Sequence, residues 1–457
     1  MKNKNIVAIL ICMILVSCGE DRRLEYVGLT TPNKAIESVM RQNYYWYEDI
    51  PESKSLNYFT TPHGDFFKSL LSKQDLNYSY FEDPADIESL RSYGIEFETS
   101  ITFNNDTAHA VRVLYVDSDS PADDAGLMRG DWIIKRNDRF IVKSRIDSLY
   151  KGSAIKLTLG EYAPFENENG QIVNDFKEKE TIQLGAARPT SDNPIHYSGM
   201  YTTPNSRIGY LFYSNFTSGK DDNDETYDNA LRTASNWFYS QGINEFILDL
   251  RYNTGGNLKS AQLLGSILVP QKALGSPMCY LKYNELQSSQ KEEWLFSQEI
   301  LGSGSNLNLE KLYVITGSIT AATSDVLINA LKPYIDEIIL IGQTTKGNHT
   351  GTHPYEHEEF SPYILHPVDC MIYNSKDELP TGGLAPTHAF NELTYESLPI
   401  GNQKEVLLSL TLGLIEEGSV PTEEDDKEEG ETRSVYMKKV PGFNTLNNKP
   451  IRGTSIR

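Results

Sequence analysis

The spacing of hydrophobic residues divides the chain into three stretches. Between residues 34 and 88 they recur every three or four positions, as at Ile36 and Met40, which is the spacing of amphipathic helices. Between residues 89 and 187 hydrophobic and polar residues alternate, which indicates half-buried strands. Between residues 188 and 415 short hydrophobic runs alternate with helical spacing, which predicts a mainly parallel sheet with crossover helices. The expected fold is therefore α+β and multidomain: a small helical N-terminal segment, a β-rich domain and an α/β domain.

The third stretch allows individual elements to be placed. Strands are predicted at residues 208–213, 245–250, 312–316 and 338–341, and helices at residues 224–241, 258–268 and 324–331. In the first of these helices, Ala230, Leu231, Ala234 and Trp237 form the face that is expected to be buried.

Residues 1–17 have the layout of a signal peptide. Two lysines precede an apolar run over residues 6–16, which is too short to span a bilayer. The run closes on Leu-Val-Ser-Cys at residues 15–18, which resembles the bacterial lipobox, in which the cysteine is lipidated. We therefore expect Cys18 to carry a lipid anchor, residues 18–33 to form a polar tether, and the protein to lie in the cell envelope, at the outer membrane or cell surface rather than the inner membrane. An ordinary secretory signal with a chance cysteine is the alternative.

Composition and charge narrow the function classes. The 457 residues carry a formal net charge of −21, which argues against a nucleic-acid partner because nucleic-acid binding needs a basic face. Residues 416–431 hold nine acidic side chains, so residues 416–457 are predicted to form a disordered acidic tail. Four cysteines exclude a disulfide scaffold, and the sequence leaves open whether Cys279 and Cys370 pair or remain buried thiols.

Two segments of the second stretch resemble a PDZ domain. Tyr93, Gly94 and Ile95 precede an alternating strand, and residues 120–133 combine a capped short helix with a Gly-Asp turn. A PDZ groove adds a peptide as a strand and holds its terminal carboxylate in a nest of backbone N–H groups. The resemblance implies a PDZ domain over residues 89–187 in which the Tyr93-Gly94-Ile95 turn binds peptide, and a generic small β domain is the alternative.

A more specific motif follows at residues 249–256, which read Asp-Leu-Arg-Tyr-Asn-Thr-Gly-Gly. It ends a predicted buried strand, where open α/β sheets place their binding sites. Gly255 and Gly256 would let backbone N–H groups approach a substrate closely, as an oxyanion hole requires. A plain strand-to-helix turn is the alternative.

Together with residues 320–325 and 342–348, this motif resembles the carboxy-terminal processing, or tail-specific, serine peptidases. The order of a helical segment, a PDZ domain, an Asp-Leu-Arg motif and a catalytic stretch is also the order in that family. The resemblance covers roughly residues 35–415. It implies a peptidase-like α/β domain over residues 188–415, protein C-termini or unfolded chains as partners, and no cofactor.

Both catalytic positions of that family are substituted in this chain. The family motif resembles Thr-Ala-Ser-Ala-Ser-Glu, and its first serine, the nucleophile, falls on Ala322. The family's general-base lysine falls on Asn348. Alanine has no oxygen that could attack a carbonyl, and an asparagine amide cannot accept a proton as a neutral lysine amine does. The resemblance therefore implies an envelope lipoprotein that binds C-termini or unfolded chains with little or no hydrolysis.

Two other functions remain open at this point. Ser324 and Lys346 each lie two residues from a substituted position and could form the shifted dyad of an active serine endopeptidase, although a helix cap is the more ordinary role for Ser324. The 27 tyrosines and the lipid anchor would also suit a module that binds glycans or partners at the cell surface.

Three histidines are spaced four residues apart at positions 349, 353 and 357. On one helix they could line up as zinc ligands. Gly347, Gly351 and Pro354 break a helix there, so a polar loop beside the catalytic stretch is expected and no metal site is assigned.

Overall fold

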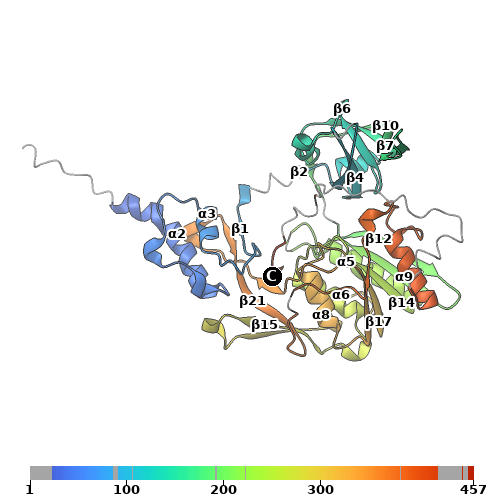
Figure 1. Ribbon diagram of the computed structural model, residues 1–457. Coiled ribbons are helices and arrows are strands. Elements are labelled where there is room, and N and C mark those ends of the chain that lie inside the picture. Colours follow the sequence, from blue (N-terminus) through green and yellow to red (C-terminus); the bar gives the residue numbers. More distant parts are fainter. Residues whose placement is uncertain are drawn as a thin grey trace, which may run out of the picture.

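The computed structural model describes residues 23–85, 91–104, 107–190, 193–221, 223–380, 382–419, 445 and 451–456 (Figure 1). These residues form helical, β-rich and α/β parts with several sheets, so the expectation of a mixed α and β fold is confirmed. The predicted signal peptide and Cys18 lie outside the described residues. Within the described ranges, no helix is both long enough and apolar enough to cross a bilayer.

The N-terminal part contains helices α2 (Arg23–Asn43) and α3 (His63–Ser69), which share a core that includes Ile36, Met40 and Phe66. Helix α2 begins inside the predicted polar tether, so that prediction is wrong over residues 23–33. In its first turns Tyr26, Val27 and Leu29 are apolar but more than half exposed, so they do not form the buried face from which a helix is recognised.

Strand β1 (Tyr80–Glu82) joins this part to the α/β domain by pairing antiparallel with β20 (Ile364–His366).

Short 3-10 turns occur across the chain at η1 (Tyr47–Asp49), η2 (Ser53–Ser55), η4 (Lys143–Leu149), η5 (Gln271–Ala273), η6 (Glu285–Gln287), η7 (Glu358–Phe360) and η8 (Glu392–Thr394).

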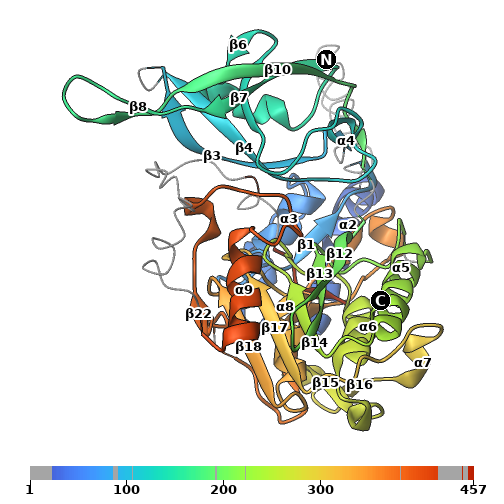
Figure 2. The same cartoon turned by 90° about the vertical axis from the view of Figure 1, so that its right-hand side faces the viewer.

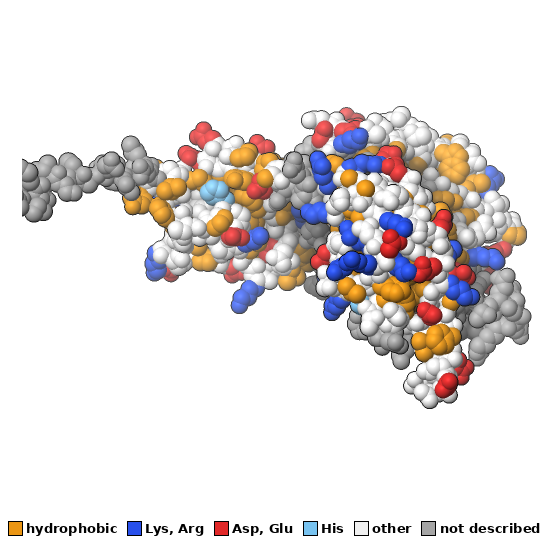
Figure 3. Space-filling model, turned by 90° about the horizontal axis from the view of Figure 1, so that it is seen from above, with side chains coloured by type: hydrophobic (Ala, Val, Ile, Leu, Met, Phe, Trp, Pro, Cys, Tyr) orange, Lys and Arg blue, Asp and Glu red, His pale blue; other side chains and the backbone are white. Residues whose placement is uncertain are grey.

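The β-rich domain is built on one antiparallel sheet in the order β10-β7-β5-β4-β3. Its strands are β3 (Ile95–Phe103), β4 (Ala108–Val116), β5 (Trp132–Arg136), β6 (Arg139–Phe140), β7 (Ile155–Tyr162) and β10 (Phe176–Leu184), with short pairs β2 (Arg91–Ser92) with β11 (Arg188–Pro189) and β8 (Phe165–Glu166) with β9 (Ile172–Val173). Strand β3 lies at the edge of the sheet. The outer face of this domain mixes acidic and basic side chains (Figure 3).

One short helix of the domain starts as the sequence predicts. Helix α4 (Pro121–Asp124) follows Ser120, whose hydroxyl accepts a hydrogen bond from the Asp123 N–H at 3.1 Å. Proline at the first helical position has no N–H to leave unsatisfied, so Ser120 and Pro121 together fix the start of this helix.

The α/β domain has a central sheet in the order β12-β13-β14-β17-β18-β22. Its strands are β12 (Ile195–Thr202), β13 (Arg207–Tyr213), β14 (Glu245–Asp249), β17 (Lys311–Thr316), β18 (Glu337–Gly342) and β22 (His388–Ala389). The strands from β13 to β22 run parallel and only β12 is antiparallel. The mainly parallel sheet predicted from the hydrophobic runs is therefore present.

Helices cover both faces of this sheet. They are α5 (Thr226–Gln241), α6 (Leu258–Leu268), α7 (Gln298–Leu301), α8 (Thr323–Leu331) and α9 (Val406–Glu417). Leu248 faces the core shared with α5, α6 and α8, whereas its neighbour Ile247 faces the core shared with α9. Figure 2 shows α9 on one side of the sheet and α6 on the other. This alternation explains why the buried strands are hydrophobic at nearly every position.

The buried face of α5 differs from the predicted one. Trp237, expected inside, has 39% of its surface exposed, whereas Phe238 is buried and its ring lies 5.1 Å from that of Phe246. The true buried face also includes Leu231 and Ser235 and is rotated by about one residue. Helical spacing alone left either face possible, and the contact with β14 decides between them.

A second sheet, which the sequence did not predict, has the order β16-β15-β21-β19-β23. Its strands are β15 (Pro277–Tyr283), β16 (Lys291–Leu295), β19 (Thr350–Thr352), β21 (Val368–Asn374) and β23 (Thr454–Ser455). The prediction of a disordered tail over residues 416–457 is wrong in two places, because α9 continues to Glu417 and residues 451–456 are packed into this sheet.

Cys279 and Cys370, on β15 and β21, are buried free thiols rather than a disulfide.

A buried ionic cluster holds the β-rich domain against the α/β domain. Arg129 reaches out of the β-rich domain, and its Nη2 lies 2.8 Å from Glu392 Oε2. The same carboxylate receives Nη1 of Arg251 at 2.5 Å, and Tyr252 donates its hydroxyl to the other oxygen at 2.7 Å. Arg112 adds a second contact by donating to the backbone carbonyls of Leu393 and Tyr395.

We predict that Glu392→Gln lowers the free energy of unfolding by about 3–5 kcal/mol, because it leaves Arg129 and Arg251 buried with less compensating charge. Burial alone would raise the pKa of Glu392, but the charges of Arg251 and Arg129 outweigh it and hold the pKa at about 2. The stabilisation that the ionised Glu392 carboxylate gives to the folded state is therefore fully present above its unfolded-state pKa of about 4.3. It is lost as the pH falls toward 2.

Urea denaturation between about pH 2.5 and about pH 7 measures both effects, with the exposed Glu356→Gln as the matched control. The two variants should differ most near neutral pH and converge in acid. Equal stabilities at neutral pH would contradict the role assigned to this cluster.

Candidate functional site

The Asp-Leu-Arg sequence ends β14 in a fully buried ion pair. Nε of Arg251 lies 3.0 Å from each carboxylate oxygen of Asp249, and Nη2 lies 2.7 Å from Oδ2. Glu405 accepts two further bonds from this guanidinium, at 2.7 and 3.1 Å. A planar guanidinium that is bound on several sides can hardly rotate, so the chain leaves the strand in one fixed direction.

Asn253 organises the turn that follows. Its Nδ2 donates to the Tyr213 carbonyl at 3.0 Å, and its own carbonyl accepts from the Ala321 N–H at 3.1 Å. Its Oδ1 accepts from the Gly255 N–H at 2.8 Å. The turn after β14 is thereby joined to the loop that carries the catalytic stretch.

Gly255 and Gly256 both have positive φ angles, 111° and 139°. A Cβ at 255 would lie 2.7 Å from the Cβ of Ala322, and one at 256 would lie 2.2 Å from the Phe216 carbonyl oxygen. The backbone at Gly255 and Gly256 therefore does pack closely, as predicted, but against Ala322 and Phe216 rather than against an open substrate position. The Gly255 N–H, expected in an oxyanion hole, is already bonded to Asn253.

Ala322 stands in a strained backbone conformation immediately before α8. Its φ of 50° and ψ of −117° are unusual for a residue with a side chain, and such strain costs about 1–3 kcal/mol. Sharp strained turns before a helix are known as nucleophile elbows because they expose a catalytic side chain. Here the turn carries only a buried methyl group.

Ser324 and Lys346, the alternative dyad, are not brought together. Ser324 is fully buried and its hydroxyl lies 3.5 Å from the Asn253 carbonyl oxygen. Lys346 is exposed, and its backbone N–H donates to the Thr320 carbonyl at 2.7 Å. Within the part of the chain that is described, no hydrogen bond joins these two side chains.

Asn348 is buried, and its amide makes hydrogen bonds through both its oxygen and its nitrogen. Its Oδ1 accepts from the N–H and the hydroxyl of Thr350, at 3.0 and 2.8 Å. Its Nδ2 donates to the carbonyl of Arg452 at 3.0 Å. The position assigned to the general base thus binds backbone and a hydroxyl instead.

Asp325 anchors the loop that carries Asn348. It accepts hydrogen bonds from the Thr345 hydroxyl and from the backbone N–H groups of Gly347 and Asn348, the latter two at 3.1 and 3.4 Å. Burial raises the pKa of Asp325 to about 7, although these hydrogen bonds act in the opposite direction. Asp325 therefore links the start of α8 to the substituted base position.

Residues 451–456, here called the tail segment, lie beside these residues, and the sequence does not predict their position. The Ser455 N–H donates to the Gly256 carbonyl at 2.9 Å, and the Thr454 and Thr323 hydroxyl oxygens lie 3.3 Å apart. The chain end marked C in Figure 1 lies between the N-terminal helices and α8. The only local signal was the pair Ile451 and Ile456, because the acidic run favoured disorder over the whole tail.

The predicted PDZ turn has part of its backbone engaged. The Tyr93 N–H donates to the Tyr150 carbonyl at 2.8 Å, and the Gly94 N–H donates to the Ser92 hydroxyl at 2.7 Å. Gly94 has a φ of 76°, and a Cβ there would lie 2.2 Å from that of Ser120. Ile95 begins the edge strand β3. The turn thus leads into a sheet edge, as a strand-adding groove would need.

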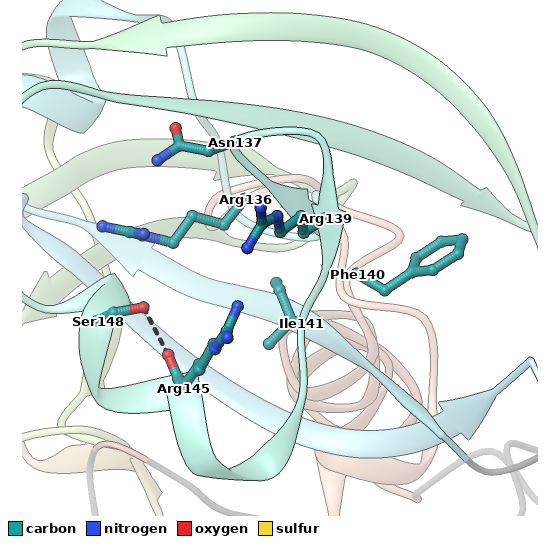
Figure 4. Close-up of a pocket in the computed structure, with 7 residues that line it drawn as sticks. All are labelled: Arg136, Asn137, Arg139, Phe140, Ile141, Arg145 and Ser148. Atoms are coloured by element: carbon teal, nitrogen blue, oxygen red, sulfur yellow. Dashed lines mark hydrogen bonds between the residues drawn. The ribbon is translucent and has the colours of Figure 1, made fainter.

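A separate hollow of about 270 Å³ opens on the β-rich domain (Figure 4). It is lined by Arg136, Asn137, Arg139, Phe140, Ile141, Arg145 and Ser148. None of these residues belongs to the Asp-Leu-Arg motif or the catalytic stretch, so this basic hollow is distinct from the candidate site.

The three histidines occupy different environments. Burial lowers the pKa of His349 to about 4, whereas for His353 the Asp369 carboxylate, 2.8 Å away, outweighs burial and raises the pKa. Among the described residues, His353, Asp369 and Cys370 form one group whose potential ligand atoms lie within 4.8 Å of one another. His349 and His357 are not part of that group.

Comparisons with known proteins point to one family. The model of peptidase family S41 matches residues 207–375, and that of the peptidase S41 N-terminal domain matches residues 32–80. An S41 protease chain from Bacteroides fragilis NCTC 9343, known from a crystal structure, is 33% identical; the match covers 84% of this chain and 97% of that one, with a TM-score of 0.75. CtpA-like serine proteases from two strains of Staphylococcus epidermidis are 24% identical over 216 residues, 47% of this chain and 38% of their own length.

We predict that Asp325→Asn changes how stability depends on pH. The folded-state pKa of about 7 lies above the unfolded value of about 3.9, so the folded state binds more protons between these values. The free energy of unfolding of the wild type should therefore fall, relative to the variant, as the pH rises from about 4 to about 7.

Urea denaturation across this range gives the measurement, and the exposed Asp336→Asn serves as the control. Parallel pH profiles for the wild type and Asp325→Asn would show that burial of this carboxyl has no energetic effect.

Proposed function

Because the chain belongs to peptidase family S41, we propose that it binds extended polypeptide at the family's catalytic position with little or no hydrolysis. The observation that carries this proposal is Ala322, which keeps the strained turn of a nucleophile elbow but presents a methyl group. Peptide hydrolysis by a serine-type mechanism requires an oxygen at that point. Loss of the nucleophile lowers catalysis by many orders of magnitude, while binding surfaces can persist.

The neighbouring polar groups support the same proposal. Asn348 is bonded on both ends of its amide, so it offers neither a free base nor a mobile proton carrier. The buried hydroxyl of Ser324 and the exposed amine of Lys346 are not within one hydrogen-bonded unit among the described residues. General-base activation requires such contact. Nothing in this geometry favours the active-endopeptidase alternative.

The proposed partners are protein C-termini or unfolded chains. Support comes from the edge strand β3, which follows the Tyr93-Gly94-Ile95 turn and, among the described residues, pairs with β4 alone. Peptides bind such edges by strand addition, with main-chain hydrogen bonds supplying affinity. We place this PDZ-like capture in the β-rich domain, next to the S41 site.

We also propose that the protein is held in the cell envelope, at the outer membrane or cell surface, by a lipid on Cys18. The support is the sequence of residues 15–18 after an apolar run. Stable anchoring requires more than one acyl chain, as lipidation of an N-terminal cysteine would supply.

Absence of hydrolysis is tested by incubating the lipid-free wild type with an unstructured protein that has an apolar C-terminal tail. We expect no fragments by mass spectrometry from the wild type or from Ser324→Ala. Fragments from the wild type that vanish in Ser324→Ala would overturn the proposal in favour of the Ser324 and Lys346 dyad.

Restoration of the family residues gives a second test. We predict that Ala322→Ser combined with Asn348→Lys produces fragments, whereas neither single variant does, because nucleophile and base act as one unit. If the folded double variant is inactive, the assignment of Ala322 and Asn348 to the family's catalytic positions is wrong.

For the anchor, we predict that Cys18→Ala moves the protein from the membrane fraction to the soluble fraction of cells and abolishes labelling by radioactive fatty acid. Cys12→Ala, a change inside the predicted signal peptide, is the matched control and should leave both unchanged. Membrane retention and labelling of Cys18→Ala would contradict the lipid anchor.

A further inference from the structure

The tail segment is bound to the chain as an added strand. Thr454 and Ser455 form β23, which runs parallel to β19 with Gly351 opposite Thr454 and Thr352 opposite Ser455. The Ile456 N–H donates to the Thr352 carbonyl at 2.9 Å. Strand addition of this kind is how proteins bind extended peptides at a sheet edge.

The other edge of the tail segment contacts the Asp-Leu-Arg turn and the N-terminal part. The Ser455 N–H donates to the Gly256 carbonyl at 2.9 Å, and the Gly453 N–H donates to the Tyr78 carbonyl at 3.0 Å. Asn348 donates to the Arg452 carbonyl at 3.0 Å. Donors and acceptors on both edges of the tail segment are therefore used, as for a peptide held inside a binding site.

Shape complementarity is tight at two glycines. A Cβ on Gly453 would lie 2.6 Å from Thr352 Cγ2 and 3.0 Å from Thr350 Oγ1, so the tail segment admits no side chain there. A Cβ on Gly351 would lie 2.7 Å from Ile456 Cδ1, so the absence of a side chain on β19 makes room for Ile456. Ile456 is only 3% exposed, and burying such a side chain contributes about 1.5–3 kcal/mol.

The tail segment also touches the residues around the substituted nucleophile. The Thr323 hydroxyl, next to Ala322, donates to the Gly256 carbonyl at 2.8 Å and lies 3.3 Å from the Thr454 hydroxyl oxygen. At the opposite end, the Arg452 guanidinium carbon lies 4.0 Å from the centre of the Tyr80 ring, a cation–π contact. The tail segment thus lies at the S41 site rather than on a remote surface.

An earlier residue of the tail lies on the β-rich domain. Thr445 is buried against the edge strand β3, where its hydroxyl accepts from the Phe97 N–H at 2.9 Å and lies 2.6 Å from Glu96 Oε2. The tail therefore contacts both surfaces for which peptide binding is proposed.

We infer that residues 451–456 are an intramolecular peptide ligand of the S41 site, and that a peptide from another protein binds there only by displacing them. The inference rests on the proposed peptide binding and adds the ligand. This is an extended segment with a glycine packed against the side chains of Thr350 and Thr352, and with a branched apolar residue three positions later over Gly351. Covalent attachment gives the tail segment an effective concentration on the order of mM, so it competes strongly with free peptides.

The experiment uses the intact chain and a fluorescein-labelled peptide with the sequence of residues 449–456, amidated at its end so that a free carboxylate plays no part. We expect the wild type to bind this peptide about ten-fold or more weakly than Gly453→Val, because the added side chain clashes with Thr352 and releases the tail segment. Fluorescence anisotropy measures the affinity.

Two controls isolate the tail segment. Ser455→Ala changes a half-buried side chain but leaves the backbone bonds of β23 in place, so it should bind the peptide as weakly as the wild type. A peptide with valine in place of its glycine should not bind Gly453→Val. Ile456→Asp, which places a charge in an apolar pocket, should release the tail segment as Gly453→Val does.

Hydrogen exchange of the unaltered chain provides a readout that needs no variant. The amides of Gly453, Ser455 and Ile456 should be protected in the wild type and lose protection in Gly453→Val. Unprotected amides in the wild type, or equal peptide affinities of the wild type and both release variants, would overturn the inference. Cleavage of the bound peptide would instead overturn only the proposed absence of hydrolysis.

Discussion

The arrangement of this chain depends on the buried guanidinium of Arg251. Its donors are shared among Asp249 on the same strand end, Glu392 in the segment before α9, and Glu405 at the start of that helix. Glu405 also accepts from the Leu408 N–H at 3.0 Å and so caps α9. The Arg251 guanidinium therefore fixes the direction in which the chain leaves β14. It also fixes the position of α9, which begins more than 150 residues later. Such a cluster is costly to bury, and it tolerates no missing partner.

The ionic cluster around Arg251 positions both candidate binding surfaces, the β-rich domain and the Asp-Leu-Arg turn. Arg129 shares Glu392 with Arg251, so the β-rich domain is held by the same charges that orient the Asp-Leu-Arg turn. The turn in turn presents Asn253, whose carbonyl and amide tie it to Ala321 and Tyr213. The strained conformation of Ala322 persists because its neighbours are fixed on both sides. A turn held in this way does not depend on the side chain at position 322 for its shape, which explains how an alanine adopts the strained conformation.

The sequence predicted those features that depend on local pattern. The parallel strands, the helices between them and the Ser120 cap follow from hydrophobic spacing and residue type, and the structure has them within a few residues. The buried face of α5 and the start of α2 were wrong because packing, or exposure of the first turns, decided them. Glu392, Glu405 and the tail segment could not be predicted, since their partners lie far away in the chain and a carboxylate in sequence looks the same whether solvated or buried. The substituted positions were visible, but their contacts were not.

Asn348, which occupies the position that the family resemblance assigns to the general base, also binds the tail segment. A lysine has three donors and no acceptor, so it could not accept the two bonds that Thr350 donates to Asn348 Oδ1. Those bonds place Thr350 at the start of β19, the strand on which β23 is laid. The other end of the same amide donates to the Arg452 carbonyl. The asparagine therefore both orients strand β19 and holds the tail segment that lies along it.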